Sequence, residues 1–198
     1  MPSIDFQILR AAEFKTTLWS GGTSTQLYIS PSDAQYKELN FDFRLSTAKV
    51  ESEISSFTSL PAISRKIMIL EGSIEIKHEN RYAKKLNKFD VDNFEGDWKT
   101  TSAGKCTDFN LMTRNGTSGS IKAHEIEKSK ILNYSISKRY SSLFVYIFLG
   151  TISIELNNKN EKIHQGDLLV IKVPSDKKLS FRALQNSELI FTEINQSI

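Results

Sequence analysis

The sequence predicts an all-β protein made of two similar units. Short runs rich in β-branched and aromatic residues dominate the chain, turn residues separate them, and helical periodicity is nearly absent. The segment Asp33–Leu39 has the length for one or two helical turns, but the neighbouring Pro31 and Asn40 favour a loop. Strands at such intervals are typical of a sandwich or barrel. The expected strands are Phe41–Val50, Arg65–Leu70, Ser73–Lys77, Thr107–Thr113, Leu143–Leu149, Thr151–Leu156, Leu168–Val173 and Glu188–Ile194.

An internal repeat supports the division into two units. The segment Ile69–Ile76 (ILEGSIEI) aligns with Ile147–Ile154 (IFLGTISI) at a constant offset of 78 residues. Each copy consists of an apolar strand, a glycine and an alternating strand, followed by a polar tip. A flexible polar stretch, Asn115–Ser120, separates the two copies. We therefore expect an N-terminal unit over residues 1–115 and a C-terminal unit over residues 121–198.

Composition limits the classes of function. Of the 198 residues, 25% are charged and 39% hydrophobic, as in a folded globular chain. The chain has no run of about 18 apolar residues to span a bilayer, and its N-terminus lacks the order of a signal peptide. A net charge of +3 with scattered basic residues argues against nucleic acid as a partner. The single cysteine, Cys106, cannot form an internal disulfide, which predicts a cytoplasmic protein. The absence of a long apolar run predicts no membrane partner.

Polar side chains alternate with apolar ones in two expected strands. Period-2 alternation places Arg44 and Ser46 on one face of their strand, and Asp108 and Asn110 on one face of theirs. In one interpretation these faces lie in water, because one side of an antiparallel sheet is commonly solvated. In the other they line the inside of a barrel, where an arginine requires an oxygen partner. Asp108 is expected to pair with an arginine such as Arg44 or Arg65.

The segment Trp19–Gln26 (WSGGTSTQ) is the hardest to explain as ordinary packing. Paired glycines allow a positive φ or a close backbone approach, small hydroxyls supply hydrogen-bonding groups, and Trp19 supplies a flat wall. The segment is either a plain turn or the mouth of a pocket, and its eight residues alone do not separate the two.

The order of strand, glycine, strand, polar tip, Gly-Asp turn and strand resembles the double-stranded β-helix of cupins, used twice. Six blocks also resemble, in order and spacing, the HutD/Ves family, bicupin proteins linked to histidine utilisation and stress responses in bacteria. The match covers residues 15–116 closely, and the second half agrees only in layout. Ser20 stands where the family has an Asn. The blocks are Trp19–Thr25, Phe43–Val50, Phe57–Arg65, Leu70–Gly72, Phe94–Asp97 and Asp108–Arg114.

The resemblance implies a bicupin fold, in which two double-stranded β-helix (jelly-roll-like) barrels pack into one compact unit. The site is expected in the N-terminal barrel, and the C-terminal barrel is expected to be degenerate. Cupins often dimerise through edge strands, so the resemblance also allows a homodimer.

Neither a metal nor another cofactor is expected. Metal-dependent cupins carry a His-x-His pair, a Glu and a later His around the first strand–Gly–strand unit, and no such pattern surrounds either repeat glycine. His78, His124 and His164 are isolated in sequence, and His78 and His164 are expected to face solvent. Cys106 follows Lys105, but we expect a semi-exposed thiol at a strand start rather than a nucleophile.

The expected function is metal-free binding of a small carboxylate metabolite, which would regulate histidine utilisation or a stress response. The family resemblance points to histidine-degradation intermediates such as formylglutamate or related acids. Arg44 and Arg65 would clamp carboxylates through bidentate hydrogen bonds, Trp19 would form an apolar wall, and Asp108 would hold an arginine in place. The expected ligand-binding residues are Trp19, Thr23, Thr25, Arg44, Ser46, Arg65, Asp108 and Asn110.

Two alternatives remain at this point. The first is a metal-independent cupin isomerase or hydrolase that uses Asp108 or Asp97 as its general base. The second is a structural or partner-binding protein with a vestigial pocket. Catalysis is the less favoured interpretation, because the sequence contains no Gly-x-Ser-x-Gly elbow and no Walker-type loop.

Overall fold

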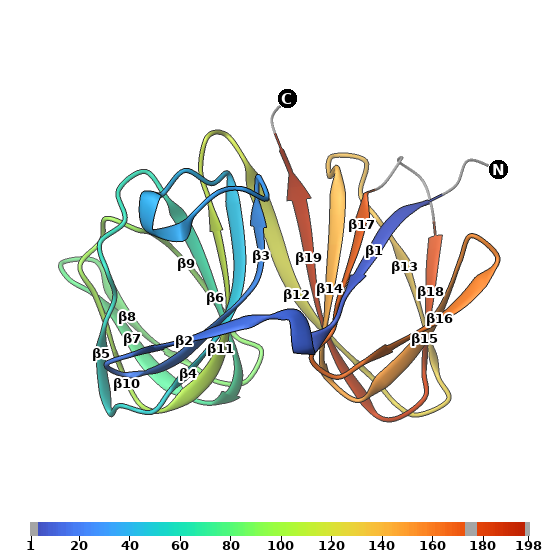
Figure 1. Cartoon of the computed structure of the whole chain (residues 1–198). Coiled ribbons are helices and arrows are strands. Elements are labelled where there is room, and N and C mark those ends of the chain that lie inside the picture. The colour runs from blue at the N-terminus through green and yellow to red at the C-terminus, as the bar shows by residue number, and fades with distance from the viewer. Residues whose placement is uncertain (1–3, 173–177, 197–198) are drawn as a thin grey trace. The chain divides into compact units, whose positions relative to one another are not determined.

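The computed structural model describes residues 4–172 and 178–196, which form antiparallel β-sheets joined by turns and short 3-10 segments (Figure 1). The chain divides into two compact units. Phe14–Thr117 form one unit, called the first barrel below. The described residues of Met1–Glu13 and Ser118–Ile198 form the other, called the second barrel. Within the described residues, no helix has the length and apolar character needed to cross a membrane.

The first barrel contains a six-stranded sheet in the order β2-β3-β4-β11-β6-β9 and a four-stranded sheet in the order β5-β10-β7-β8. The edge strands are β2 and β9 in the first sheet and β5 and β8 in the second. The elements are β2 (Lys15–Trp19), β3 (Gly22–Ser30), the 3-10 helix η2 (Tyr36–Glu38), β4 (Phe43–Val50), β5 (Ile54–Ser56), β6 (Ser64–Gly72), β7 (Ile74–His78), β8 (Tyr82–Leu86), β9 (Val91–Glu95), β10 (Thr100–Ala103) and β11 (Cys106–Thr113).

The second barrel contains a five-stranded sheet in the order β1-β17-β14-β19-β12 and a four-stranded sheet in the order β13-β18-β15-β16. The elements are β1 (Asp5–Leu9), the 3-10 helix η1 (Ala11–Glu13), β12 (Ser118–Ile126), β13 (Ile131–Ser135), β14 (Ser142–Leu149), β15 (Thr151–Leu156), β16 (Lys159–His164), β17 (Leu168–Lys172), β18 (Lys178–Ala183) and β19 (Ser187–Asn195). The strand expected over Leu168–Val173 corresponds to β17, and Val173 lies outside the described residues.

The internal repeat is a repeat of structure as well as of sequence. Gly72 joins β6 to β7, and Gly150 joins β14 to β15 in the same way. Both copies also have a β-bulge at the same point, because the pairing skips Leu70 opposite β11 and Phe148 opposite β19. These two residues are 78 positions apart, which is the offset of the sequence repeat. A bulge at matching positions shows that the two barrels share their strand register.

The N-terminal segment belongs to the second barrel. β1 pairs antiparallel with β17, with Asp5 opposite Lys172. The residues that follow β1 are held to the same barrel by Asp167. Its side chain accepts hydrogen bonds from Arg10 Nη1 at 2.7 Å and from the backbone N–H of Ala11 at 3.0 Å. The compact units therefore differ from the expected ranges of 1–115 and 121–198 at the N-terminus. Pairing between segments so distant in sequence leaves no local signal in either one.

The interiors of the two barrels differ in character. Apolar side chains from both sheets fill the second barrel, with Phe181, Phe191 and Leu143 almost completely buried. In the first barrel, a smaller apolar cluster that includes Ile67 and Ile76 fills only part of the interior. A second apolar cluster includes Phe41 and Ile63. The rest of the interior contains the cavity described next, whose wall has both polar and apolar side chains.

Candidate ligand-binding site

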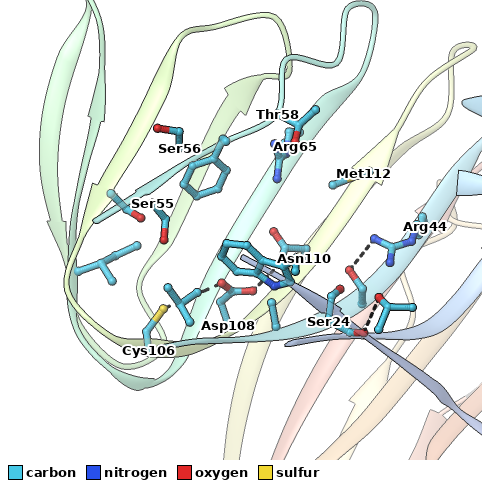
Figure 2. Close-up of a pocket in the computed structure, with 18 of the residues that line it drawn as sticks. Ser24, Arg44, Ser55, Ser56, Thr58, Arg65, Cys106, Asp108, Asn110 and Met112 are labelled. Atoms are coloured by element: carbon cyan, nitrogen blue, oxygen red, sulfur yellow. Dashed lines mark hydrogen bonds between the residues drawn. The ribbon is translucent and has the colours of Figure 1, made fainter. Parts of the chain in front are cut away.

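A cavity of about 300 Å³ lies within the first barrel (Figure 2). Alternate residues of β4 and β11 form much of its wall, because side chains of a strand point to opposite faces with a period of two. The residues of β4 on this face include Arg44 and Ser46, and those of β11 include Asp108, Asn110 and Met112. All five are buried, so the polar faces line the inside of a barrel rather than a solvated surface.

The two arginines of the cavity lie at the same level of the sheet. Met112 in β11 is directly opposite Arg44 in β4 and directly opposite Arg65 in β6. Adjacent strands are about 4.8 Å apart, so the two Cα atoms are roughly 10 Å apart, with one methionine between them. Both side chains extend into the cavity in Figure 2. The register of three strands thus brings two guanidinium groups to one side of the same small space.

Neighbouring side chains hold Arg44 in place. Its Nε donates to Gln26 Oε1 at 3.0 Å and its Nη1 donates to Ser46 Oγ at 2.9 Å. The guanidinium carbon also lies 4.4 Å from the centre of the Tyr36 ring. Burial lowers the pKa of Arg44 from its ordinary value. None of these partners carries a full negative charge, so the guanidinium charge is oriented but not neutralised.

Arg65 has still fewer partners. Its guanidinium lies between two aromatic rings, 5.0 Å from the centre of Phe57 and 5.1 Å from the centre of Phe94. Its Nε is buried without a hydrogen-bond partner among the described residues. Burial is the main cause that lowers the pKa of this residue, and the nearby Arg44 lowers it further. A buried, incompletely bonded guanidinium costs free energy, which indicates that the position is kept for another purpose than stability.

Asp108 lies further along β11 and has an unexpected partner. Asn110 Nδ2 donates to Asp108 Oδ1 in a very short hydrogen bond, and Cys106 Sγ lies 4.0 Å from Oδ2. The expected ion pair with Arg44 or Arg65 is not formed. Burial raises the pKa of Asp108 to about 7, although the Asn110 hydrogen bond and the charge of Arg65 act in the opposite direction. Burial therefore favours the neutral form of this carboxyl group much more than water does.

Cys106 is buried at the start of β11, whereas the sequence predicted a semi-exposed thiol. Burial and the nearby Asp108 raise the pKa of this thiol to about 12. Because the thiolate is the nucleophilic form, such a cysteine is chemically inert at neutral pH. Cys106 contributes to the wall of the cavity and offers no reactive group.

The β2–β3 hairpin forms one edge of the cavity and explains the Trp-Ser-Gly-Gly sequence. Ser20, which is exposed, and Gly21, which is buried, form the turn, so Trp19 pairs with Gly22 across the hairpin. A Cβ atom at Gly21 would overlap the ring of Trp19. At Gly22, where φ is +152°, a Cβ atom would overlap the carbonyl oxygen of Lys49. The first glycine therefore makes room for the tryptophan ring and the second for the adjoining strand.

The expected roles of Thr23 and Thr25 are wrong in placement. The hairpin register pairs Thr17 with Ser24, and this pair points into the cavity. Thr23 and Thr25 alternate to the other face, where the hydroxyl of Thr25 bonds that of Thr16 at 2.7 Å. Had Ser20-Gly21 been taken as a two-residue hairpin turn, the sequence would have predicted that Thr17 lies opposite Ser24.

The remaining expected ligand-binding residues do line one cavity: Trp19, Arg44, Ser46, Arg65, Asp108 and Asn110. The sequence reasoning missed further contributors to its wall, among them Tyr36, Phe57 and Ser55. Tyr36 comes from η2 and Phe57 from the loop after β5, so neither has a strand pattern that marks the face it presents. Asp97, the alternative general base, lies on an exposed turn and is not part of the cavity wall.

His78 is buried, and the expectation that it faces solvent is wrong. Only 1% of it is exposed. Its Nε2 lies 2.9 Å from Asp92 Oδ2 and its Nδ1 lies 2.8 Å from Thr100 Oγ1. Its ring also packs against Phe94 at 4.8 Å between centres. These partners come from β9 and β10, so the turn that follows His78 in sequence gave no sign of them. His164 is exposed, as expected.

The cavity does not fit the metal that many cupins hold. Its wall contains one carboxyl group, one thiol and two arginines, but no imidazole. Among residues 4–172 and 178–196, no group of three or more His, Cys, Asp or Glu side chains is arranged to hold a metal ion. Two guanidinium groups also repel a cation. The donor set instead suits an anion.

Three positions of the cavity wall have apolar counterparts in the second barrel. Strand register makes Leu143 the counterpart of Arg65, Leu189 the counterpart of Asp108, and Phe191 the counterpart of Asn110. All three counterparts are almost completely buried in the apolar core of that barrel. The arginine-lined cavity is thus a feature of the first barrel and not of the repeated fold.

Two antiparallel β units with this repeat define a bicupin, and solved structures of similar fold support that class. The chain belongs to the HutD family, whose model matches residues 11–191. PA5104 of Pseudomonas aeruginosa PAO1 is similar with a TM-score of 0.83 and 19% identity, over 97% of this chain and 100% of that one. HutD of Pseudomonas fluorescens SBW25, solved in a formate condition, is similar with a TM-score of 0.75 and 17% identity, over 98% and 100%.

The likeness extends to a cupin enzyme. The oxalate decarboxylase of Lactobacillus farciminis, in complex with formate, has a TM-score of 0.68 and 8% identity to this chain, over 98% of this chain and 87% of that one. At such identities the likeness establishes the fold only. A comparison with curated proteins finds no match.

Proposed function

We propose that the first barrel binds a small carboxylate metabolite between Arg44 and Arg65, without a metal. The observation that supports this most strongly is the guanidinium of Arg65, which is buried beside the cavity with its Nε unbonded. Carboxylates are natural partners for guanidinium groups, because the planar fork matches their two oxygens. A bound carboxylate would supply the negative charge and the hydrogen-bond acceptors that both arginines lack.

The rest of the cavity suits a small organic acid. Ser46, Asn110 and Ser24 in the cavity wall offer hydrogen-bonding groups, and Trp19 and Phe57 offer apolar surface. A volume of about 300 Å³ is at the lower end of the range for small-molecule sites. Formate is the smallest carboxylate. HutD of P. fluorescens was solved in a formate condition, and the oxalate decarboxylase was solved in complex with formate. Membership of the HutD family directs attention to intermediates of histidine degradation, such as formylglutamate.

We propose a regulatory rather than a catalytic role. The protein would sense or buffer its ligand and so influence histidine utilisation or a stress response in the cytoplasm. The observation that favours this role is the absence of a reactive nucleophile in the cavity wall, where the one thiol has its pKa raised to about 12.

One observation favours the enzyme alternative. The pKa of Asp108, raised by burial to about 7, is suited to a general base at neutral pH. Asp97, being exposed and outside the wall of the cavity, has no comparable environment. If the protein is an isomerase or hydrolase, Asp108→Asn will abolish turnover and leave binding intact.

The test is calorimetric titration of the full chain with formate, L-glutamate, urocanate and N-formyl-L-glutamate. We expect at least one to bind, and Arg44→Ala to weaken binding by about 2 kcal/mol or more, which is roughly thirtyfold. Arg182→Ala is the matched control, because Arg182 is an exposed arginine of the second barrel. Binding by none of the four acids would contradict the proposal and leave a vestigial pocket as the better interpretation. Product analysis by NMR in the same samples separates binding from turnover.

A further inference from the structure

We propose that Asp108 takes up a proton when the carboxylate binds, so that the cavity accepts an anion and a proton together. This inference rests on the proposed function and adds a specificity-determining residue to it. The proton comes from solvent and binds Oδ2, because Oδ1 accepts the short hydrogen bond from Asn110, whereas the donor at Oδ2 is the weaker Cys106 thiol at 4.0 Å. No covalent bond changes, and the protonated carboxyl group becomes a hydrogen-bond donor.

The argument begins with the charges that share the cavity. The ionisable groups in its wall are Arg44, Arg65, Asp108, Cys106 and Tyr36. The strands that face Asp108 from the four-stranded sheet contribute only neutral side chains: Ser55, Ser56, Ile74 and Ser102. When Asp108 is ionised, its negative charge partly offsets the two positive guanidinium charges. When Asp108 is neutral, both positive charges can act on a ligand.

The size of the cavity sets the next step. A sphere of about 300 Å³ is about 8 Å across, so a carboxylate held by the arginines lies within roughly that distance of Asp108. Two carboxylates held close together among buried side chains disfavour each other's ionised form. In the free protein, the positive charge of Arg65 lowers the pKa of Asp108. An anion bound to the guanidinium offsets that charge and so weakens its effect on the pKa.

The surroundings of Asp108 already favour the neutral form. The residue is 4% exposed and has no ion pair with either arginine, and its raised pKa of about 7 places the transition at neutral pH. A ligand carboxylate raises this pKa further, so binding above pH 7 is accompanied by proton uptake. Carboxylate affinity therefore falls as the pH rises above 7, with a limit of about tenfold per pH unit for one proton.

Asp108→Asn separates proton uptake from binding itself. Asparagine has nearly the shape of the protonated carboxyl group and cannot ionise. We expect this variant to bind at every pH with the affinity that the wild-type protein has at pH 6. Cys106 is not a competing source of the pH dependence, since its pKa of about 12 lies far above the range of the experiment. Asp33→Asn is the control, because Asp33 is an exposed turn residue outside the cavity wall, and it should keep the wild-type pH profile.

The experiment is calorimetric titration of the full chain with formate and with N-formyl-L-glutamate at pH 6, 7 and 8. Each titration is run in bis-Tris propane and in a zwitterionic sulfonate buffer of the same pH, whose different heats of ionisation reveal protons taken up. Phosphate is avoided, because it is itself an anion that arginines bind. The expected result at pH 8 is an uptake close to one proton and a Kd about tenfold higher than at pH 6, with neither effect in Asp108→Asn. Binding without proton uptake would overturn this inference alone. Failure of both acids to bind at any pH would overturn the proposed function as well.

Discussion

Arg44 and Arg65 occupy equivalent positions on the two strands that flank β11, and both are directly opposite Met112. Neither is paired with a carboxylate within the described part of the chain, although both are more than nine-tenths buried. Two like charges enclosed together are unfavourable unless an anion joins them. This arrangement is therefore the basis for the carboxylate site, and each prediction below tests one part of it.

Replacement of Arg65 by methionine should stabilise the protein and abolish ligand binding. Methionine fills a similar volume between Phe57 and Phe94 and removes a charge whose Nε is buried without a partner. We expect the free energy of unfolding to rise by about 1–3 kcal/mol, seen as a higher Tm. The matched change Arg182→Met, at an exposed site, should alter neither quantity. A lower Tm for Arg65→Met would mean that the arginine is structural.

Replacement of Arg44 by lysine should weaken carboxylate binding even though the charge is kept. The guanidinium of Arg44 donates to Gln26 Oε1 through Nε and to Ser46 Oγ through Nη1. These two hydrogen bonds fix the orientation of the whole group. A lysine ammonium offers one point of contact and no fork. We predict an affinity loss of roughly tenfold or more by calorimetry, with a Tm change of only a few degrees. Unchanged affinity would show that charge alone suffices.

The pH dependence of stability should identify Asp108. Folding raises its pKa from an ordinary value near 4 to about 7, mainly through burial. A raised carboxyl pKa gives stability that is fully present below about pH 4 and is lost as the pH rises through 7. The wild-type protein should lose stability relative to Asp108→Asn over this interval, by up to the order of 4 kcal/mol. Thermal unfolding at pH 4, 5.5, 7 and 8 measures the difference, and parallel profiles would refute the assignment.

A pair of neighbouring substitutions in β3 tests the orientation of the hairpin. Ser24 points into the cavity, whereas Thr25 lies on the other face with Thr16. Ser24→Val adds methyl groups to the cavity and should reduce carboxylate affinity at least threefold. Thr25→Val has nearly the same shape as the native residue and should leave the affinity unchanged, with a stability loss of about 0.5 kcal/mol. The reverse order of effects would restore Thr25 to the site.

Much of the site followed from the sequence because it lies on regular strands. Alternation predicted that Arg44 and Ser46 share one face of β4 and that Asp108 and Asn110 share one face of β11. The family resemblance then placed Trp19 at the same site. Pattern alone could not decide whether these faces were wet or enclosed, since that depends on the second sheet, whose strands pair far from them in sequence. Burial in the structure decides that question in favour of an enclosed face.

The errors have equally physical causes. Thr23 and Thr25 were placed on the wrong face because the parity of β3 depends on the hairpin turn, and a one-residue shift reverses every side chain. His78 was taken for a surface residue because Asp92 and Thr100, which bond it, belong to other strands. The expected salt bridge of Asp108 is replaced by a bond from Asn110, two residues away on the same face.

The most direct test of the carboxylate site observes the guanidinium groups themselves. In the ¹⁵N spectrum of arginine side chains, the Nε–H signal of Arg65 is assigned by its disappearance in Arg65→Met. Titration with N-formyl-L-glutamate or formate should shift this signal downfield and slow its exchange with water, because an unbonded N–H acquires an acceptor. The signal of Arg182 should stay in place. An Arg65 signal that remains unchanged at saturating acid would contradict the account.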